Sequence, residues 1–367
     1  MKKFMLFATA VGLTLTSCVN DEETTMMGSR SVIAFDAPVM KTSRVNVFGE
    51  VTGVKYPEGE TFKVFSKIYQ GSYAGWATNT EDYFATAGDE AKHEGGTYWS
   101  TSTIYYWPDA GYNLAFAAYS PAVLGNAAQA TTITRTAEGI QIADFVSEPE
   151  SDKQYDLMYS HTVYDRNKAN NAASAVSLKF EHALSSIVFS SQKSDEAAQY
   201  RITDLMVTGD FITKGSFNQG ITPATSGGAY TENENPQWDT EDVTPTAVQY
   251  EPTFTAFQVP AASPEIFTQG SSAILAIPQE VPQSAKVHVT YEKTTTTGTT
   301  TTHTAEIFLK DFKKATAEGT AVAEGIDEWE RGKRYVYRIA FGENQRIYFE
   351  PSITDWEQQP TLIYTIK

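Results

Sequence analysis

Short runs of alternating apolar and polar residues recur along almost the whole chain. In residues 61–68, TFKVFSKI, Phe62 and Val64 alternate with Lys63 and Phe65. Successive side chains of a β-strand point to opposite faces, so this period of two predicts strands with a buried face. The runs with this pattern, or with a short continuous apolar stretch, are residues 31–36, 61–68, 102–108, 112–121, 154–160, 176–184, 200–209, 273–279, 286–292, 333–341 and 362–367.

Turn-forming residues separate these runs. Pro108 and Pro121 each end a run, and a proline cannot donate a hydrogen bond within a strand ladder. Only residues 311–319 resemble a helix, and they allow a single turn. Aromatic residues make up 13% of the chain, which favours strands. The sequence therefore predicts an all-β fold built as a sandwich or a barrel.

A threonine-rich stretch interrupts the alternation at residues 294–302, TTTTGTTTT. Threonine favours strands, and Gly298 stands at the centre, where a turn can use a positive φ. We expect an exposed hairpin tip that joins residues 286–292 to residues 303–312.

The length of 367 residues favours two domains over one. Residues 165–174, DRNKANNAAS, are small and polar and show no periodicity, so they are the best candidate linker. The predicted division is a signal peptide at 1–17, a tether with an N-terminal strand at 18–44, a first sandwich at 45–170 and a second at 171–367.

The first residues have the order of an export signal. Lys2 and Lys3 precede an apolar run from Phe4 to Leu15, which is too short to span a bilayer. Small residues then lead to Cys18, the only cysteine of the chain. This order resembles the lipobox of bacterial lipoproteins, which implies acylation of Cys18 and attachment to a membrane. The alternative is an ordinary secretory signal in which the cysteine stands by chance.

The charge narrows the choice of partners. The chain has 28 basic and 45 acidic residues, a net charge of -17, so phosphate backbones and anionic lipid headgroups repel it. We therefore expect no nucleic-acid partner.

The residue patterns of enzymes and metal sites are missing. No two of the five histidines have metal-ligand spacing, and no nucleophile elbow, P-loop, dinucleotide fingerprint or EF-hand loop occurs. His182 shares the apolar face of its strand and is expected in the core, whereas His288 alternates outward. We expect no catalytic residues, no metal and no cofactor. A pair of acidic residues for glycoside hydrolysis is available on paper in any chain this acidic.

One aromatic cluster offers a different role. Trp76 lies near Tyr73 in the glycine-rich residues 70–79, QGSYAGWATN. An exposed pair of this kind would form a platform for sugar rings, but ordinary packing in the core or in a loop is the favoured interpretation.

Eight segments, taken in order, resemble the fimbrillin family of Bacteroidetes, which are fimbrial subunits that reach the surface as lipoproteins. They are SVIAFDAPVMKTSR at 31–44, YYWPDAGYNLAFAAYSP at 105–121, YDLMYS at 155–160, VSLKFEHALSSIVF at 176–189, ITDLMVTGDFITKGSFN at 202–218, LAIPQ at 275–279, WERGKRYVYRIAF at 329–341 and ITDW at 353–356. Each segment is weak alone, whereas the ordered set is specific.

The resemblance implies two tandem transthyretin-like β-sandwich domains and assembly by strand exchange. An Arg-specific protease removes the N-terminal strand, and a strand of another subunit fills the vacated groove. Ile33 and Phe35 are then the side chains that fill this groove before the cut. Cutting after Arg30 leaves the strand attached, so Arg44 is the expected cut site. The alternative is that Arg44 stays uncut in an anchor subunit that keeps its lipid.

At the other end, LIYTIK is the candidate donor strand, with Leu362, Tyr364 and Ile366 on one face; it can equally be an ordinary strand of its own sheet. The implied partners are other fimbrial subunits, the outer membrane through lipid on Cys18, and a surface receptor for cell adhesion. The competing interpretation is a monomeric glycan-binding lipoprotein of the cell surface.

Overall fold

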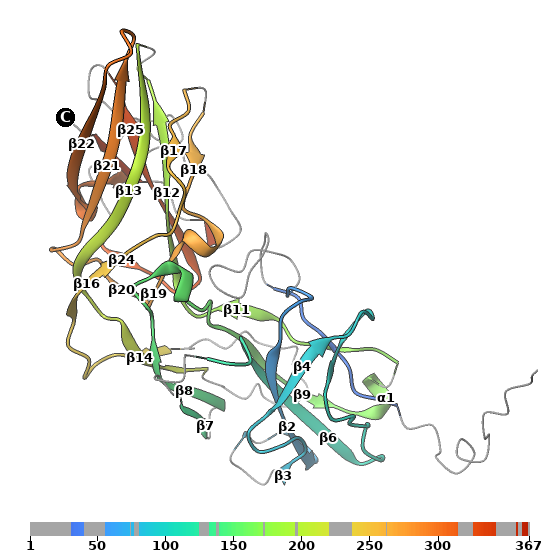
Figure 1. The fold of residues 1–367 in the computed structure, drawn as a ribbon. Coiled ribbons are helices and arrows are strands. Elements are labelled where there is room, and N and C mark those ends of the chain that lie inside the picture. The colour runs from blue at the N-terminus through green and yellow to red at the C-terminus, as the bar shows by residue number, and fades with distance from the viewer. Residues whose placement is uncertain are drawn as a thin grey trace, which may run out of the picture.

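The structure is a computed structural model. It describes residues 31–39, 56–73, 75–76, 81–124, 132–136, 139–171, 173–194, 197–219, 237–261, 263–314, 326–342, 357–358 and 362–365. Of the predicted site residues, Cys18, Arg44 and Ile366 lie outside these ranges, as does the second candidate cut site, Arg30. Nearly all regular structure in the described ranges is β, which confirms the predicted fold class (Figure 1).

A nine-stranded sheet dominates the N-terminal half. Its strands are β1 (Phe35–Asp36), β2 (Phe62–Gln70), β3 (Glu81–Asp82), β4 (Asp89–His93), β5 (Trp99–Thr101), β6 (Tyr112–Ser120), β9 (Met158–Arg166), β10 (Val176–Ser177) and β11 (Phe180–His182). They follow the order β10-β1-β5-β4-β2-β6-β9-β11, and β3 pairs with β2. The N-terminal strand β1 is therefore an interior strand of this sheet.

Two further sheets form the C-terminal half. The seven-stranded sheet has the order β18-β12-β25-β27-β23, with β19 beside β12 and β26 beside β25. Its strands are β12 (Ser185–Lys193), β18 (Glu265–Ile266), β19 (Ile274–Ala276), β23 (Lys313–Lys314), β25 (Lys333–Phe341), β26 (Glu357–Gln358) and β27 (Leu362–Thr365). The five-stranded sheet has the order β16-β13-β21-β22, with β17 beside β13. Its strands are β13 (Ala198–Phe211), β16 (Thr246–Tyr250), β17 (Phe257–Gln258), β21 (Lys286–Thr295) and β22 (Thr300–Phe308).

These two sheets share one hydrophobic core. Phe189 of β12 and Tyr337 of β25 belong to the same buried cluster as Ile202 of β13, Val289 of β21 and Ile307 of β22. Because apolar faces of two sheets meet in this cluster, the C-terminal half is a β-sandwich.

A four-stranded sheet connects the halves. Its strands, in spatial order, are β15 (Gln237–Asp239), β14 (Lys214–Asn218), β8 (Gly139–Val146) and β7 (Thr132–Thr136). Phe145 of β8 and Phe217 of β14 pack in one buried cluster with Phe65 and Tyr119 of the nine-stranded sheet. The described sheets thus combine segments from both sides of residue 170, and the division into 45–170 and 171–367 stays a prediction.

The remaining elements are short. They are α1 (Lys168–Asn171), the 3₁₀ turns η1 (Ser151–Lys153), η2 (Gly270–Ser272) and η3 (Leu309–Asp311), and the pair β20 (Gln279–Glu280) with β24 (Glu328–Trp329). Among the described residues, no helix has the length and hydropathy that a membrane span requires.

Most of the predicted strands overlap an observed strand, although 31–36 contains only the short β1, 154–160 overlaps only the start of β9, and 176–184 is divided into β10 and β11. Residues 102–108 are an exception. They form a loop with a single bridge, between Tyr106 and Val32, so the predicted strand there is wrong. The predicted hairpin is confirmed, because β21 and β22 pair antiparallel from Lys286–Phe308 to Thr294–Thr300. Gly298 in its turn has a φ of 83°.

Candidate functional site

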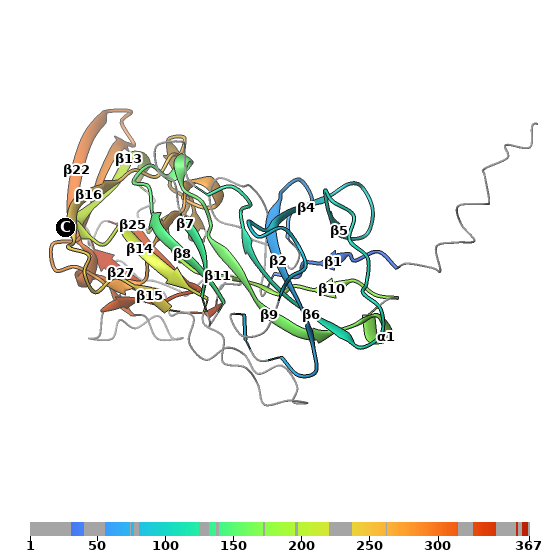
Figure 2. The ribbon, with the colours of Figure 1, turned by 90° about the horizontal axis from the view of Figure 1, so that it is seen from below.

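The N-terminal segment 31–39, with β1 as its regular part, lies between two strands that are distant in the sequence (Figure 2). Phe35 pairs antiparallel with Trp99 of β5 on one side and parallel with Val176 of β10 on the other. Isolated bridges extend the pairing at both ends, between Val32 and Tyr106 and between Val39 and Phe180. The segment thus closes a gap between β5 and β10.

Backbone hydrogen bonds hold this segment along its length. On the β10 side, the amides of Val176, Leu178 and Phe180 donate to the carbonyls of Ala34, Asp36 and Pro38 at 2.8, 2.7 and 2.9 Å. On the other side, Ile33 donates to Tyr105, Trp107 donates to Ser31, and Tyr56 donates to Ala37, each at 2.9 Å. Removing segment 31–39 would leave the backbone groups that bond to it without these hydrogen bonds.

Every second side chain of the segment is buried. Ile33, Phe35, Ala37 and Val39 are between 0% and 4% exposed, whereas Val32 is 49% exposed. Burying a large apolar side chain contributes about 1.5–3 kcal/mol, so Ile33, Phe35 and Val39 are the main anchors. This confirms that Ile33 and Phe35 lie on one buried face, as the alternation predicts.

Phe35 lies at the centre of an aromatic cluster. Its ring meets Phe62, Phe84 and Phe116 edge to face, with centroid distances of 6.5, 6.2 and 5.5 Å. Edge-to-face pairs are a favoured geometry for aromatic rings. Without Phe35, the sheet would contain an apolar hole lined by these three rings.

The C-terminal strand β27 lies in an equivalent position in the other half. Leu362 to Thr365 pair parallel with Tyr337 to Ala340 of β25, and Ile363 and Leu362 pair antiparallel with β23. Like β1, this strand therefore has a parallel neighbour on one side and an antiparallel neighbour on the other. The pairing matches the prediction of an ordinary sheet strand, and the donor role of Leu362, Tyr364 and Ile366 stays a prediction.

The histidines whose side chains the structure describes contact neighbouring side chains. His182 is 3% exposed and lies 3.0 Å from Asp156, which places it in the core as predicted. His288 is partly exposed; its Nε2 lies 2.8 Å from the Thr208 hydroxyl. Within the described ranges, no group of three acidic, histidine or cysteine side chains could hold a metal ion.

A polar cluster joins the two halves near the start of β25. The hydroxyl of Tyr159 donates to Glu181 at 2.8 Å, and Arg331 donates to the same hydroxyl. The Arg331 guanidinium also lies 5.4 Å from the centroid of the Tyr159 ring. Burial raises the pKa of Tyr159, so its hydroxyl remains a donor at neutral pH. The cluster is a structural contact between β9, β11 and the turn before β25.

Sequence reasoning offered Trp76 as a sugar platform, and the structure places it in the core. Trp76 is 2% exposed, and its indole N–H donates to the Thr162 hydroxyl at 3.1 Å. Tyr73 is 8% exposed and stacks on Tyr164 at 5.0 Å. Because both rings are covered, they offer no face to a sugar, and core packing is the correct interpretation.

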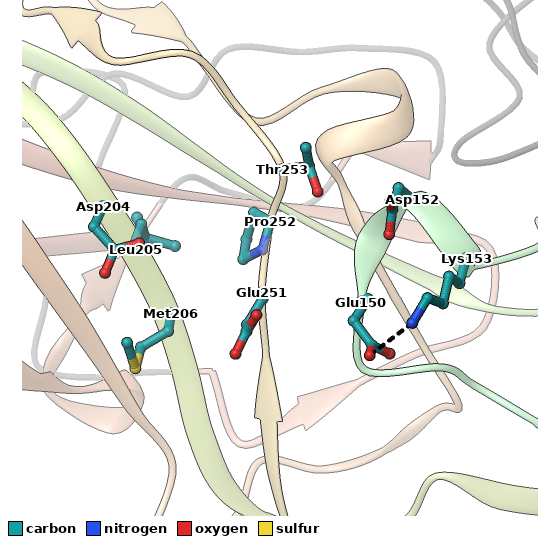
Figure 3. Close-up of a pocket in the computed structure, with 9 residues that line it drawn as sticks. All are labelled: Glu150, Asp152, Lys153, Asp204, Leu205, Met206, Glu251, Pro252 and Thr253. Atoms are coloured by element: carbon teal, nitrogen blue, oxygen red, sulfur yellow. Dashed lines mark hydrogen bonds and ion pairs between the residues drawn. The ribbon is translucent and has the colours of Figure 1, made fainter.

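A pocket of about 480 Å³ lies where η1 meets β13, and Figure 3 shows its lining. Glu150, Asp152, Asp204 and Glu251 supply carboxylates, and Lys153 is the basic residue of the lining. Lys153 pairs with Glu150 at 2.9 Å, and this hydrogen bond holds the pKa of Glu150 below its ordinary value. A general acid for glycoside hydrolysis needs a raised pKa, so Glu150 does not have the required property.

The family model described as "Fimbrillin-like" matches residues 56–356. Among curated proteins, none matches the chain.

Solved structures of similar fold come from Bacteroides. A fimbrial protein from Bacteroides vulgatus ATCC 8482 has a TM-score of 0.53 and 17% identity, over 86% of this chain and 96% of that one. A putative cell adhesion protein from Bacteroides ovatus ATCC 8483 has a TM-score of 0.44 and 14% identity, over 90% of this chain and 99% of that one. The first likeness shows a shared fold, while the second is too distant to show one. Since the family model covers most of the chain, this protein belongs to the fimbrillin-like family.

Proposed function

We propose that the protein is a non-enzymatic subunit of surface fimbriae that supports cell adhesion and assembles by strand exchange. The observation that carries the proposal is the N-terminal segment 31–39, which is an interior strand with alternately buried side chains. Membership of the fimbrillin-like family supports it, as does the similar fold of a solved fimbrial protein.

In the proposed mechanism, a protease cuts after Arg44 and segment 31–39 leaves the nine-stranded sheet. The gap between β5 and β10 then exposes the rings around Phe35 and the amides of Val176, Leu178 and Phe180. An extended strand from a second subunit can pair with these groups and fill the apolar hole. Because a head-to-tail contact of this kind does not close on itself, repeated exchange builds a filament.

The proposed donor is the C-terminal strand around Leu362 and Tyr364. In its own sheet, β27 has a parallel neighbour and an antiparallel neighbour, which is the arrangement that β1 has between β10 and β5. A strand that pairs between β25 and β23 can therefore use the same combination of parallel and antiparallel pairing between β10 and β5. The donor is proposed to come from a neighbouring subunit, so that each copy fills the groove of the next.

The decisive experiment treats the purified precursor with an Arg-specific protease. We expect the product to begin after Arg44 by mass spectrometry, and to form ladders that withstand mild denaturation in electrophoresis. Arg44→Ala should block both the cut and the ladders, while Arg30→Ala, the matched control, should leave both intact. A cut product that remains monomeric would overturn the assembly mechanism.

Delivery through a lipid is the second part of the proposal. We propose that Cys18 is acylated and holds the precursor at the outer membrane, exposed on the cell surface. Labelling of cells with a palmitate analogue should mark the wild type and not Cys18→Ser, and the variant should leave the membrane fraction. If Cys18→Ser is still labelled, Cys18 is not the lipid site. If Arg44 is not cut in cells, the proposed role becomes that of an anchor subunit.

A further inference from the structure

The strand β22 lies at an open edge of the five-stranded sheet. The sheet order ends at β22, and among the described residues no strand pairs with its outer side (Figure 1). The strand is nine residues long, and Thr300 to Thr304 are all exposed. A long exposed edge is a template onto which another strand can add.

The backbone groups that face this edge can be identified. Two bonds at the ends of the hairpin fix the alternation: Thr295 donates to Thr299 and Leu309 donates to Ala285, each at 2.9 Å. In an antiparallel pair, directly bonded positions alternate with positions whose N–H and C=O point away from the partner. The uninterrupted register of β21 with β22 therefore directs the backbone groups of Thr300, Thr302 and Thr304 outward.

From Thr300 to Ala305, this edge lacks the features that usually prevent strand addition. Natural edge strands carry lysine or proline, contain bulges or are very short. The residues at 300–305, TTTHTA, include neither lysine nor proline, and their register with β21 has no bulge.

The charge distribution indicates which partner fits. The chain has 45 acidic residues and a net charge of -17, so two copies repel one another over most of their surface. Residues 294–305 contain no acidic side chain, so the hairpin adds no like-charge repulsion of its own where two copies meet. A second copy also brings the same row of threonines, and threonine pairs across strands are favourable.

We propose that two copies of this chain pair through their β22 edges, antiparallel and centred on Thr302. Thr300 of one copy then lies opposite Thr304 of the other, and the two Thr302 residues lie opposite each other. Each such pair exchanges two N–H···O=C bonds, so the two sheets become one continuous sheet across a twofold axis. This contact uses neither terminal strand and does not depend on strand exchange.

A contact of this length is small, so it is weak between free monomers and becomes effective where many copies are held close together. Disulfide trapping can detect such a weak contact. Opposed residues in a bonded antiparallel pair have Cα atoms about 5.5 Å apart, which suits a disulfide. Cys18 is the only natural cysteine, so Cys18→Ser provides a background without other thiols.

The test compares Thr302→Cys with Thr297→Cys in this full-length background, under mild oxidation of the purified protein. Thr297 is an equally exposed residue of the hairpin turn, outside the proposed pairing, and reports random collision. We expect the Thr302→Cys dimer to form about tenfold faster or more. Equal rates for the two variants would overturn the proposal.

A second substitution tests whether backbone pairing causes the cross-link. Thr304→Pro removes an outward N–H while leaving the bonds of β22 to β21, and Thr304→Lys adds a charge at the same edge. Added to Thr302→Cys, each should reduce cross-linking to the rate of Thr297→Cys, while thermal unfolding shows that the fold is kept. Undiminished cross-linking in the folded double variants would also refute edge pairing.

Discussion

The aromatic anchor of the N-terminal strand gives the most direct test of how segment 31–39 is held. Phe35 is 0% exposed and meets three phenylalanine rings, so Phe35→Ala leaves a cavity lined by those rings. Such a truncation typically costs about 3–5 kcal/mol. Because the segment contributes a single strand to its sheet, we expect this loss to act mainly on local release of the segment.

The magnitude can be converted into an observable. A loss of about 3–5 kcal/mol raises the population of the released segment by about 10²- to 4 × 10³-fold, as long as global unfolding remains rarer. The amides of Val176, Leu178 and Phe180 donate to segment 31–39, so their hydrogen exchange reports this release. Hydrogen-exchange mass spectrometry of a peptide covering residues 174–182 should show faster exchange by that factor.

Val32→Ala is the matched control, because Val32 belongs to the same segment and its side chain is 49% exposed. Its effect should stay below about 0.5 kcal/mol, or roughly twofold in exchange. Peptides from β21 should exchange as in the wild type in both variants. If Phe35→Ala leaves residues 174–182 as protected as Val32→Ala does, the segment is not held by its buried face. Equal acceleration in β21 would show global destabilisation instead.

Three other substitutions test separate parts of the fold. Gly88→Ala should lower the free energy of unfolding by about 2 kcal/mol or more in urea titrations. The reason is that Gly88 has a φ of +74° and an added Cβ would lie 2.8 Å from the Phe65 ring. Gly59→Ala is the control, because the space around Gly59 is open. Arg331→Ala should lower the free energy of unfolding by about 1–3 kcal/mol in the same assay, because it removes the cation beside the partly buried Glu181. Lys214→Ala is the control: it removes the exposed Lys214–Asp144 pair and should lower that free energy by less than about 0.5 kcal/mol. Burial raises the pKa of Tyr119 to about 12, so its contribution to stability is complete below the ordinary tyrosine pKa of 10.0 and is lost as the pH rises from there through the folded value. The free energy of unfolding of Tyr119→Phe should therefore fall less steeply with pH than that of the wild type between pH 10 and 12. An equal fall in both proteins would contradict this assignment.

The sequence predicted the features that depend on local alternation of apolar and polar residues. Ile33 and Phe35 read as one face of a strand, and they are buried together. The loop at 102–108 has a similar alternation, but its Trp107 amide bonds to Ser31 of the N-terminal segment and no regular strand forms. Local pattern cannot separate these two cases, because the difference lies in which distant backbone is available as a partner.

Long-range pairing is the part that could not be predicted from the sequence. Val176 lies beside Phe35 although more than a hundred residues separate them, and nothing in either run specifies a parallel register. The strand β12 is buried on both faces, so its residues show no period of two. For Trp76, the glycine-rich context left both exposure and packing open, and only the fold shows that the ring is covered and that Thr162 accepts its N–H.

The forces on segment 31–39 explain why a covalent cut would matter in the proposed assembly. Ile33, Phe35 and Val39 together contribute roughly 5–9 kcal/mol through burial. While the segment is part of the chain, no translational or rotational freedom is lost when it docks. After a cut the same docking is bimolecular, and association costs an estimated 4–15 kcal/mol. The two quantities are comparable, so the cut would convert a permanently filled gap into one that a strand of another subunit can occupy. A donor strand on a subunit that is already held nearby has a high effective concentration at the gap. The released segment is no longer tethered and does not have this advantage.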